Sequence, residues 1–278
     1  MLLPSFAVDD IITTALKEDI HYLDTTTDLM IPADSRSTAR FLAKAEGVVC
    51  GMEIAMRVFT LLDDSFTCRV YVQDGDPVKP GDVLAECEGS TRFLLKGERT
   101  ALNLLQHLSG IASATNRAVK LVEGTRATIT DTRKTLPGLR ALQKYAVTVG
   151  GGKNHRFNLS DGAMLKDNHI DAAGGITPAV NALRSRLGHM VKLEVETRNL
   201  DEVKEALAAG ADIIMLDNMS CEDMRRAVEL AAGRVPLEAS GGITAETLRQ
   251  VAETGVDIIS IGALTHSVKA LDISMKIK

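Results

Sequence analysis

Apolar residues in the second half of the chain occur in short runs that alternate with longer stretches of helical periodicity. Each short run has the length and the apolar centre of a buried β-strand. The runs lie at residues 127–134, 163–168, 192–197, 212–218, 236–242 and 257–263. Repeated strand–helix units of this kind predict a parallel sheet, which is either closed as a barrel or doubly wound.

The helices between these runs share start and stop signals. After the third run, Asn199 is at an N-cap position, Glu202 is at the capping-box position and Gly210 follows the last apolar residue. After the fifth run, Thr244 is the predicted cap and Gly255 the predicted stop. These signals strengthen the prediction of alternating strands and helices.

The ends of the six runs favour a barrel over a doubly wound sheet. Each run is apolar in its middle and finishes on a polar or glycine-bearing group. In chain order these are Arg133 with Lys134, then Lys166, Glu196, Asp217, Ser240-Gly241-Gly242 and Gly262. In a β/α barrel all strands end at one mouth, whereas a doubly wound sheet concentrates ligand contacts at its switch point. Because the sequence has six such runs and not eight, we predict an incomplete, irregular β/α barrel.

The first part of the chain has a different pattern. A helix is expected at residues 8–18, a strand and turn at 38–51, an amphipathic helix at 51–63 and a long helix at 92–124. Short strands surround the turn dipeptides Asp74-Gly75 and Pro80-Gly81. This part is therefore predicted to be a small antiparallel sheet with helices.

Composition excludes several classes of function. The chain has 278 residues, a net charge of −5, 3% aromatic residues and no Trp, so a nucleic-acid-binding surface is not expected. No apolar run approaches the length of a membrane span, and the start of the chain lacks the basic region of a signal peptide. The four cysteines are widely spaced without a CxxC pair, which is typical of reduced, mostly buried thiols in a cytoplasmic protein.

Positive charge is nevertheless concentrated in one segment of this acidic chain. Residues 131–169 contain seven Lys or Arg and three Asp, and therefore carry a net charge of +4. The segment includes "VGGGKNHRFNLSDGAMLKDNHI", in which three glycines precede Lys153, His155 and Arg156. A local basic patch of this kind indicates a small anionic ligand, because Arg and Lys pair with carboxylates and phosphates. A solvated face or structural ion pairs are the alternative, and the glycines are equally compatible with a simple turn.

Carboxylates and glycines occupy the remaining strand ends. Glu196 and Asp217 end adjacent runs and suit a divalent cation, sugar hydroxyls or a cationic transition state, although charge balance for the lysines explains them equally well. Glu194 shares a strand face with Glu196, and periodicity does not separate them. "SGGI" and "IGAL" follow the last two runs, where barrels often bind phosphate.

Five segments between residues 95 and 267 together resemble the decarboxylating quinolinate phosphoribosyltransferases. They are "LKGERTALNLLQHLSGIA", "DTRKTLPGLRALQKYAVTVGGGKNHRFNLSDGAMLKDNH", "GADIIMLDN", "EASGGIT" and "TGVDIISIGALTHS". The resemblance implies an N-terminal α/β sandwich domain at residues 1–108 and an irregular barrel at residues 109–267. Residues 268–278 would rejoin the first domain. It also implies a homodimer, or a larger assembly of dimers, with a site completed by the partner subunit.

The resemblance also assigns roles to individual residues. Arg99, which by itself reads as a solvated charge in the first turn of a helix, would be contributed across the dimer interface. The substrate pocket would contain Thr132, Arg133, Lys134, His155, Arg156 and Lys166. Glu196 and Asp217 would face the ribose and Mg²⁺, directly or through substrate or water. The phosphoribosyl pyrophosphate loops would be Ser240-Gly241-Gly242 and Ile261-Gly262-Ala263, with His266 nearby.

The implied reaction joins quinolinate to phosphoribosyl pyrophosphate and releases pyrophosphate and CO₂, a step of NAD biosynthesis. Lys134, Lys166, Glu196 and Asp217 would be the catalytic residues, with Mg²⁺ as cofactor. Three alternatives remain at this stage. They are a phosphoribosyltransferase that uses nicotinate, a Schiff-base aldolase or isomerase with Lys166 as nucleophile, and a non-enzymatic phosphometabolite sensor.

Overall fold

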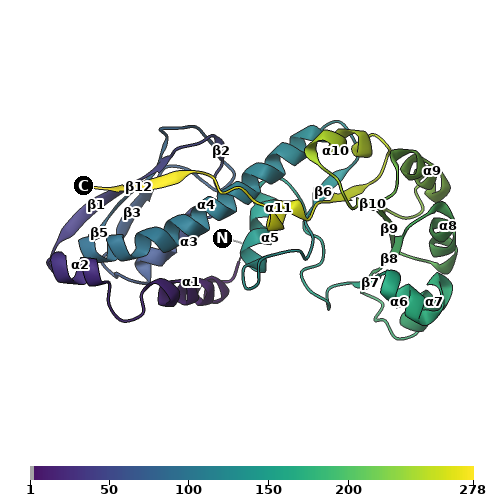
Figure 1. The fold of residues 1–278 in the computed structure, drawn as a ribbon, viewed down its shortest axis with the longest axis horizontal. Helices are drawn as coiled ribbons and strands as arrows, with labels where there is room; N and C mark the ends of the chain where they lie inside the picture. Colours follow the sequence, from purple (N-terminus) through teal and green to yellow (C-terminus); the bar gives the residue numbers. More distant parts are fainter. Residues whose placement is uncertain (1–2) are drawn as a thin grey trace. The chain divides into compact units, whose positions relative to one another are not determined.

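The computed structural model describes residues 3–278, which form two compact units (Figure 1). The first unit contains the residues up to Asn116 together with residues 135–151 and 264–278. The second contains residues 117–134 and 152–263. Segments that are distant in the sequence are therefore grouped in each unit.

The first unit is built on an antiparallel sheet. Its strands are β1 (Arg36–Ala43), β2 (Gly47–Val48), β3 (Thr67–Val70), β4 (Pro77–Val78), β5 (Val83–Ser90) and β12 (Ile273–Ile277). The strand order in the main sheet is β12-β1-β5-β3, and β2 pairs with β4. The helices are α1 (Ser5–Asp19), α2 (Thr25–Met30), α3 (Met52–Thr60), α4 (Thr91–Leu121), which continues beyond this unit, and α5 (Arg140–Val149). The predicted antiparallel sheet with helices is confirmed.

Aromatic and aliphatic side chains fill the core of the first unit. Phe41 of β1 and Phe59 of α3 are fully buried, with ring centroids 6.0 Å apart in an edge-to-face arrangement. The amphipathic helix predicted at 51–63 is α3, in which Ile54 and Val58 face this core. It ends earlier than predicted, and Leu61 lies beyond it at 36% exposure.

The second unit contains the six predicted strands in one parallel sheet. They are β6 (Thr128–Thr130), β7 (Ala163–Leu165), β8 (Leu193–Thr197), β9 (Ile213–Asp217), β10 (Leu237–Ser240) and β11 (Ile258–Ser260). The order is β6-β11-β10-β9-β8-β7, so β6 and β7 are the edges and the barrel is not closed. The predicted irregular, incomplete barrel is confirmed.

Helices cover the outer side of this curved sheet (Figure 1). They are α6 (Asp167–Ala173), α7 (Ile176–Arg184), α8 (Leu200–Ala209), α9 (Cys221–Ala231) and α10 (Ala245–Ala252). A further short helix, α11 (Ala263–His266), begins at the last residue of the second unit and otherwise belongs to the first. Fully buried aliphatic residues in the middle of the strands, such as Val195, Leu216 and Ile259, hold the sheet against these helices.

The predicted helix signals are confirmed with one correction. The Asn199 side chain accepts hydrogen bonds from the N–H groups of Asp201 and Glu202, and Gly210 ends α8 in the left-handed conformation. Glu202 does not complete a capping box with Asn199. Its carboxylate instead accepts the backbone N–H of Arg198 at 2.7 Å and pairs with the Arg198 guanidinium. Among residues 3–278, no helix is both long enough and apolar enough to cross a membrane.

Candidate functional site

A cavity of about 380 Å³ lies at the carboxyl ends of the strands in the second unit. Because parallel strands all end at one side of a sheet, residues far apart in the sequence meet there. The lining residues are Thr132, Arg133, Lys134, His155, Arg156, Met164, Lys166, Glu196, Met215, Asp217, Glu238, Ser240 and Ser260. The cavity thus brings together four Lys or Arg side chains and the two carboxylates predicted at strand ends.

Some of the predicted site residues do not line this cavity. Gly241 and Gly242 directly follow the lining residue Ser240, and the segment Ile261-Gly262-Ala263 directly follows Ser260. Arg99 and His266 belong to the first unit, where both are exposed. The predicted set is therefore divided between a shared cavity, two loops next to it in sequence, and two residues elsewhere.

Buried Asp131 fixes the loop that carries His155 and Arg156. The preceding residue Lys153 pairs with the end of β6, where its N–H donates to the Ile129 carbonyl at 2.8 Å. Asp131 is completely buried and accepts the N–H of His155 at 2.9 Å and the side-chain amide of Asn154 at 2.6 Å. Without this carboxylate the loop would leave buried N–H groups unpaired, which is costly.

The Arg156 guanidinium is held against the start of β7. One terminal nitrogen donates to the Gly162 carbonyl at 2.8 Å, and the other lies 3.7 Å from the sulfur of Met164. Burial and the nearby charge of Arg133 lower the pKa of Arg156. An arginine remains charged under these conditions, so the cavity has a positive wall that an anion would stabilise.

His155 faces two buried glutamates beneath the cavity. Its Nε2 lies 3.0 Å from the carboxylate of Glu194 and 3.6 Å from that of Glu238, which are 4% and 2% exposed. Its Nδ1 accepts the backbone N–H of Arg156 at 2.8 Å, so the ring proton belongs on Nε2, where it is donated to the glutamates. Both ring nitrogens are thus engaged within the protein.

These three residues are close enough together to suggest a metal site. A metal bound at Nε2 of His155 would displace the ring proton to Nδ1, where it would face the N–H of Arg156. Two donors would then oppose each other. The hydrogen-bonding pattern therefore favours a proton shared among His155, Glu194 and Glu238, not a metal ion.

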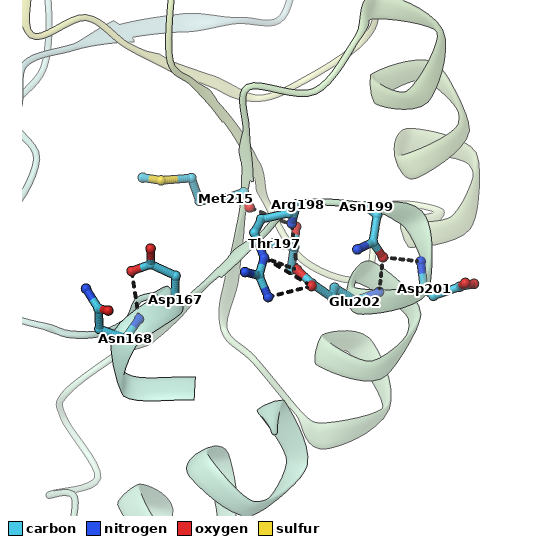
Figure 2. Close-up of polar contacts among 8 residues, drawn as sticks. All are labelled: Asp167, Asn168, Thr197, Arg198, Asn199, Asp201, Glu202 and Met215. Carbon is cyan, nitrogen blue, oxygen red and sulfur yellow. Dashed lines mark hydrogen bonds and ion pairs between the residues drawn. The ribbon is translucent and has the colours of Figure 1, made fainter. Parts of the chain in front are cut away.

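Glu196 is the last but one residue of β8 and Asp217 is the last residue of β9, and hydrogen bonds around the end of β8 fix this region (Figure 2). The Thr197 hydroxyl donates to the Met215 carbonyl at 2.9 Å and ties β8 to β9, while the next residues turn into α8. Burial raises the pKa of Glu196; the charge of Lys166 opposes this shift, and the charge of Asp217 adds to it. Two close carboxylates of this kind would be stabilised by a bound cation.

Lys166 lies across from Glu196 at the cavity mouth. Its ammonium nitrogen is 3.8 Å from the Glu196 carboxylate, and its side chain is 50% exposed. His169 accepts the Lys166 backbone N–H through Nδ1 at 3.1 Å, and so caps the start of α6. Of the two glutamates on β8, Glu196 lines the cavity and Glu194 lies buried below it with His155.

Two sets of glycines have different uses. Gly241 has a φ of +95°, and a Cβ there would overlap the side chain of Asn218, so no other residue fits without a shift. The triple glycine Gly150-Gly151-Gly152 instead ends α5. A Cβ at Gly150 would meet the Ala112 carbonyl of α4 at 2.5 Å, so this glycine allows close helix packing within the first unit.

Sequence reasoning missed Asp131, Glu238 and Ser260 as site residues. Asp131 was counted only as a charge, and nothing in its neighbourhood signalled burial. Glu238 lies two residues before Ser240 on β10, and Ser260 is the last residue of β11. Strand alternation places Glu238 on the same face as Ser240, and this signal was available in the sequence.

We expect Glu238→Gln to stabilise the protein at alkaline pH. Burial raises the pKa of Glu238 from its ordinary 4.5 to about 7, with the charge of Glu194 contributing and His155 opposing. Ionising such a group costs folding free energy, and the cost grows as the pH rises from about 4.5 towards 7. Glutamine does not ionise, so the gain should reach about 2–3 kcal/mol at pH 8 and vanish near pH 4. Thermal unfolding across this pH range measures it.

Glu229→Gln, at an exposed position of α9, is the matched control for this prediction. Its stability should follow the wild-type curve at every pH. A Glu238→Gln protein that is less stable than wild type at pH 8 would show that the ionised carboxylate is required to pair with His155.

Comparison with known proteins gives consistent matches along the chain. The family model described as quinolinate phosphoribosyl transferase, N-terminal domain, matches residues 24–109, and that of the C-terminal domain matches residues 111–276. A probable nicotinate-nucleotide pyrophosphorylase (carboxylating) of Bacillus subtilis is 48% identical over 94% of this chain and 90% of its own length. The nicotinate-nucleotide pyrophosphorylase (carboxylating) of Mycobacterium leprae is 44% identical over 97% of this chain and 96% of its own length.

Solved structures agree with the sequence matches. The crystal structure of NadC from Streptococcus pyogenes has a TM-score of 0.96 and 46% identity, and it covers 100% of this chain and 99% of that one. The nicotinate-nucleotide pyrophosphorylase of Francisella tularensis has a TM-score of 0.95 and 42% identity, covering 99% of this chain and 98% of that one. Both units of the fold are therefore found in these proteins.

Proposed function

The chain belongs to the quinolinate phosphoribosyltransferase family, and on this basis we propose that its cation-lined cavity is where quinolinate and phosphoribosyl pyrophosphate react. The enzyme is a decarboxylating phosphoribosyltransferase of NAD biosynthesis. The quinolinate ring nitrogen attacks the anomeric carbon, and the bond from that carbon to pyrophosphate breaks. The carboxylate next to the nitrogen then leaves as CO₂, its bonding electrons stay on the ring, and the ring carbon takes up a proton to give nicotinate mononucleotide.

The observation that carries this assignment is the set of cations around one small cavity. Arg133, Lys134, Arg156 and Lys166 all line it, and quinolinate has two adjacent carboxylates to pair with them. Such pairing fixes the ring so that its nitrogen faces the anomeric carbon, which is catalysis by positioning. The Thr132 hydroxyl accepts the N–H of Lys134 at 3.0 Å and thereby holds the turn that presents these side chains.

His155 has a supporting role in this proposal. Because both of its ring nitrogens are engaged by Arg156 and the buried glutamates, it orients the loop that carries Arg156. His155 also lines the cavity, where it would contact the substrate. We assign no general base, because neither attack by the ring nitrogen nor loss of CO₂ requires a proton to be removed.

Glu196 and Asp217 suit the ribose and a magnesium ion. Mg²⁺ usually binds to one or two carboxylates, with water and substrate phosphate as its other ligands. Glu196 and Asp217, which both line the cavity, would supply the carboxylates. When bound, the ion would spread the charge of the departing pyrophosphate. The carboxylates themselves would stabilise the positive charge that develops on the ribose and accept hydrogen bonds from its hydroxyls.

Lys134 and Lys166 provide positive charge for the leaving pyrophosphate as well as for quinolinate. Lys166 is half exposed, and its ammonium nitrogen lies 3.8 Å from the Glu196 carboxylate. Schiff-base chemistry requires a neutral amine, which is usually obtained by desolvation. The aldolase alternative is therefore disfavoured.

The loops after β10 and β11 suit the 5-phosphate of the ribose. Ser240-Gly241-Gly242 precedes α10, and Ile261-Gly262-Ala263 leads into α11, whose first residue is Ala263. Backbone N–H groups at such positions bind phosphate in other β/α barrels. His266 follows the second loop by three residues in the sequence and is included in this proposal.

Gly241→Ala tests the phosphate loop. The substitution is expected to raise KM for phosphoribosyl pyrophosphate at least about tenfold, because the new Cβ would overlap Asn218 and the φ of +95° is unfavourable for alanine. Gly242→Ala is the control for the overlap, because Gly242 also has a positive φ, of +60°, but the nearest atom to its Cβ is 3.8 Å away. Steady-state kinetics should show little change in KM for quinolinate in either variant. Equal effects of the two substitutions would contradict the role of the Gly241–Asn218 contact.

We also propose that the active form is a homodimer, or a larger assembly of dimers, in which Arg99 enters the cavity of the partner subunit. Arg99 is exposed on α4 and available for such a contact. A cavity that must bind a dicarboxylate, a phosphate and a pyrophosphate would gain one more cation from it.

Two acids distinguish the proposed reaction from transfer to nicotinate. With phosphoribosyl pyrophosphate and Mg²⁺, quinolinate should be used far better than nicotinate, because a monocarboxylate leaves part of the cation set unpaired. Equal use of the two acids by the purified protein would favour the nicotinate enzyme instead.

A further inference from the structure

Two cysteines in the first unit lie directly opposite each other on neighbouring strands. Cys68 of β3 and Cys87 of β5 are register partners in the antiparallel pair. Residue 71, one position past β3, donates its N–H to the carbonyl of its own partner, Leu84, at 2.9 Å. The pair 71–84 is therefore hydrogen-bonded, and by alternation the pair 68–87 is a non-hydrogen-bonded one.

This position in the ladder brings the two sulfur atoms close together. In non-hydrogen-bonded pairs the Cα atoms are only about 4.5 Å apart and the side chains lean towards each other. That spacing falls within the range that a disulfide can bridge without backbone movement. Both cysteines are free thiols in this structure, and each shifts the pKa of the other.

The two thiols differ in their access to solvent. Cys68 is exposed on the edge strand β3, whereas Cys87 is 3% exposed and its sulfur lies 3.6 Å from that of Met56. Cys68 lines a cavity of about 740 Å³ that also includes Met52, Met56 and Tyr71. A cavity of this size admits a small molecule. The exposed thiol can therefore meet a reagent while the buried thiol waits behind it.

We propose that Cys68 and Cys87 form a thiol–disulfide exchange site that takes low-molecular-weight disulfides. The Cys68 thiolate attacks one sulfur of the small disulfide, forms a mixed disulfide and releases one thiolate. Cys87 then attacks the Cys68 sulfur and displaces the second thiolate, so that a Cys68–Cys87 bond remains. The two cysteines lose two protons and two electrons, and the small disulfide becomes two thiols.

The electrostatics of the pair support this order of events. The neighbouring Cys87 thiol lowers the pKa of Cys68 to about 7, and a thiolate is the attacking species in exchange. The same interaction, together with burial, raises the pKa of Cys87. Cys87 is thus protonated until the mixed disulfide forms, as expected for the resolving partner.

Treatment of the whole protein with excess oxidised glutathione at pH 8 tests the site. Free thiols should fall from four to two, and peptide mapping without reductant should recover a linked Cys68–Cys87 peptide. Dithiothreitol should restore all four thiols. In Cys87→Ala the reaction should stop at a glutathione adduct on Cys68, whereas Cys68→Ser should react at neither position.

Cys221→Ser is the matched control, because Cys221 is a partly exposed thiol outside this pair, in the second unit. It should form the Cys68–Cys87 link at the wild-type rate. A stable glutathione adduct on Cys68 in the wild-type protein, with no linked peptide, would overturn the proposal. Modification of Cys221 as fast as that of Cys68 would also overturn it.

Discussion

Replacing Arg133 with alanine is expected to reduce kcat/KM for quinolinate roughly a thousandfold, because a buried charge pair with a substrate carboxylate would be lost. Arg133 follows β6 at the positive wall of the cavity, beside Arg156. The loss should fall mainly on quinolinate, and KM for phosphoribosyl pyrophosphate should change little. Arg133→Lys keeps the charge without the planar fork, so its activity should lie between those of wild type and Arg133→Ala.

Arg126→Ala is the control for this experiment. Arg126 lies just before the same strand at its opposite end, where it pairs with Asp257 away from the cavity. Its kinetic constants should match those of the wild type. If Arg133→Ala released CO₂ at a near-normal rate, the assignment of the cation-lined cavity to quinolinate would be wrong.

Arg99→Ala should reduce activity as much as Arg133→Ala, a substitution in the cavity itself. Activity should return when inactive Arg99→Ala subunits are mixed with inactive Arg133→Ala subunits. In a dimer made of one Arg99→Ala subunit and one Arg133→Ala subunit, both substitutions fall in the same site and the other site is intact. Random mixing should therefore restore about a quarter of the wild-type activity. The measurement is CO₂ release after co-refolding or co-expression of the two variants.

An Arg99 that acted within its own subunit would give a different result. Every site in the mixture would then carry one substitution, and the activity would equal the average of the two inactive parents. Arg99→Ala alone should stay inactive under the same treatment, and wild-type protein treated in the same way measures the losses on refolding.

Much of the fold could be predicted because its signals are local. Each of the six apolar runs contains one strand, and the cap and stop residues of α8 lie where the pattern placed them. Closure of the sheet was harder to predict. A closed barrel would require the edge strands β6 and β7 to pair, and this depends on the number and curvature of all strands in the sheet. In the sequence, only the number of runs indicated that the barrel is incomplete.

Residues of the candidate site could be predicted where a charged side chain coincides with the carboxyl end of a predicted strand. They could not be predicted where the role of a residue depends on its burial in the folded protein. Lys166 directly follows β7, Glu196 is the last but one residue of β8 and Asp217 is the last of β9, so the direction of a parallel sheet brings them together. The partners of His155 could not be predicted, because Glu194 and Glu238 are separated by more than forty residues and meet only in the folded interior. The role proposed for Arg99 has no local signal in the sequence, since a charge in a first helical turn is usually solvated.

The most direct test of the proposed function follows pyrophosphate and CO₂ together when the purified protein receives quinolinate, phosphoribosyl pyrophosphate and Mg²⁺. The predicted result is one pyrophosphate and one CO₂ for each nicotinate mononucleotide formed, with neither product when quinolinate is omitted or Mg²⁺ is chelated. Pyrophosphate release without CO₂, or equal turnover with nicotinate, would contradict the assignment of this cavity to a decarboxylating transfer onto quinolinate.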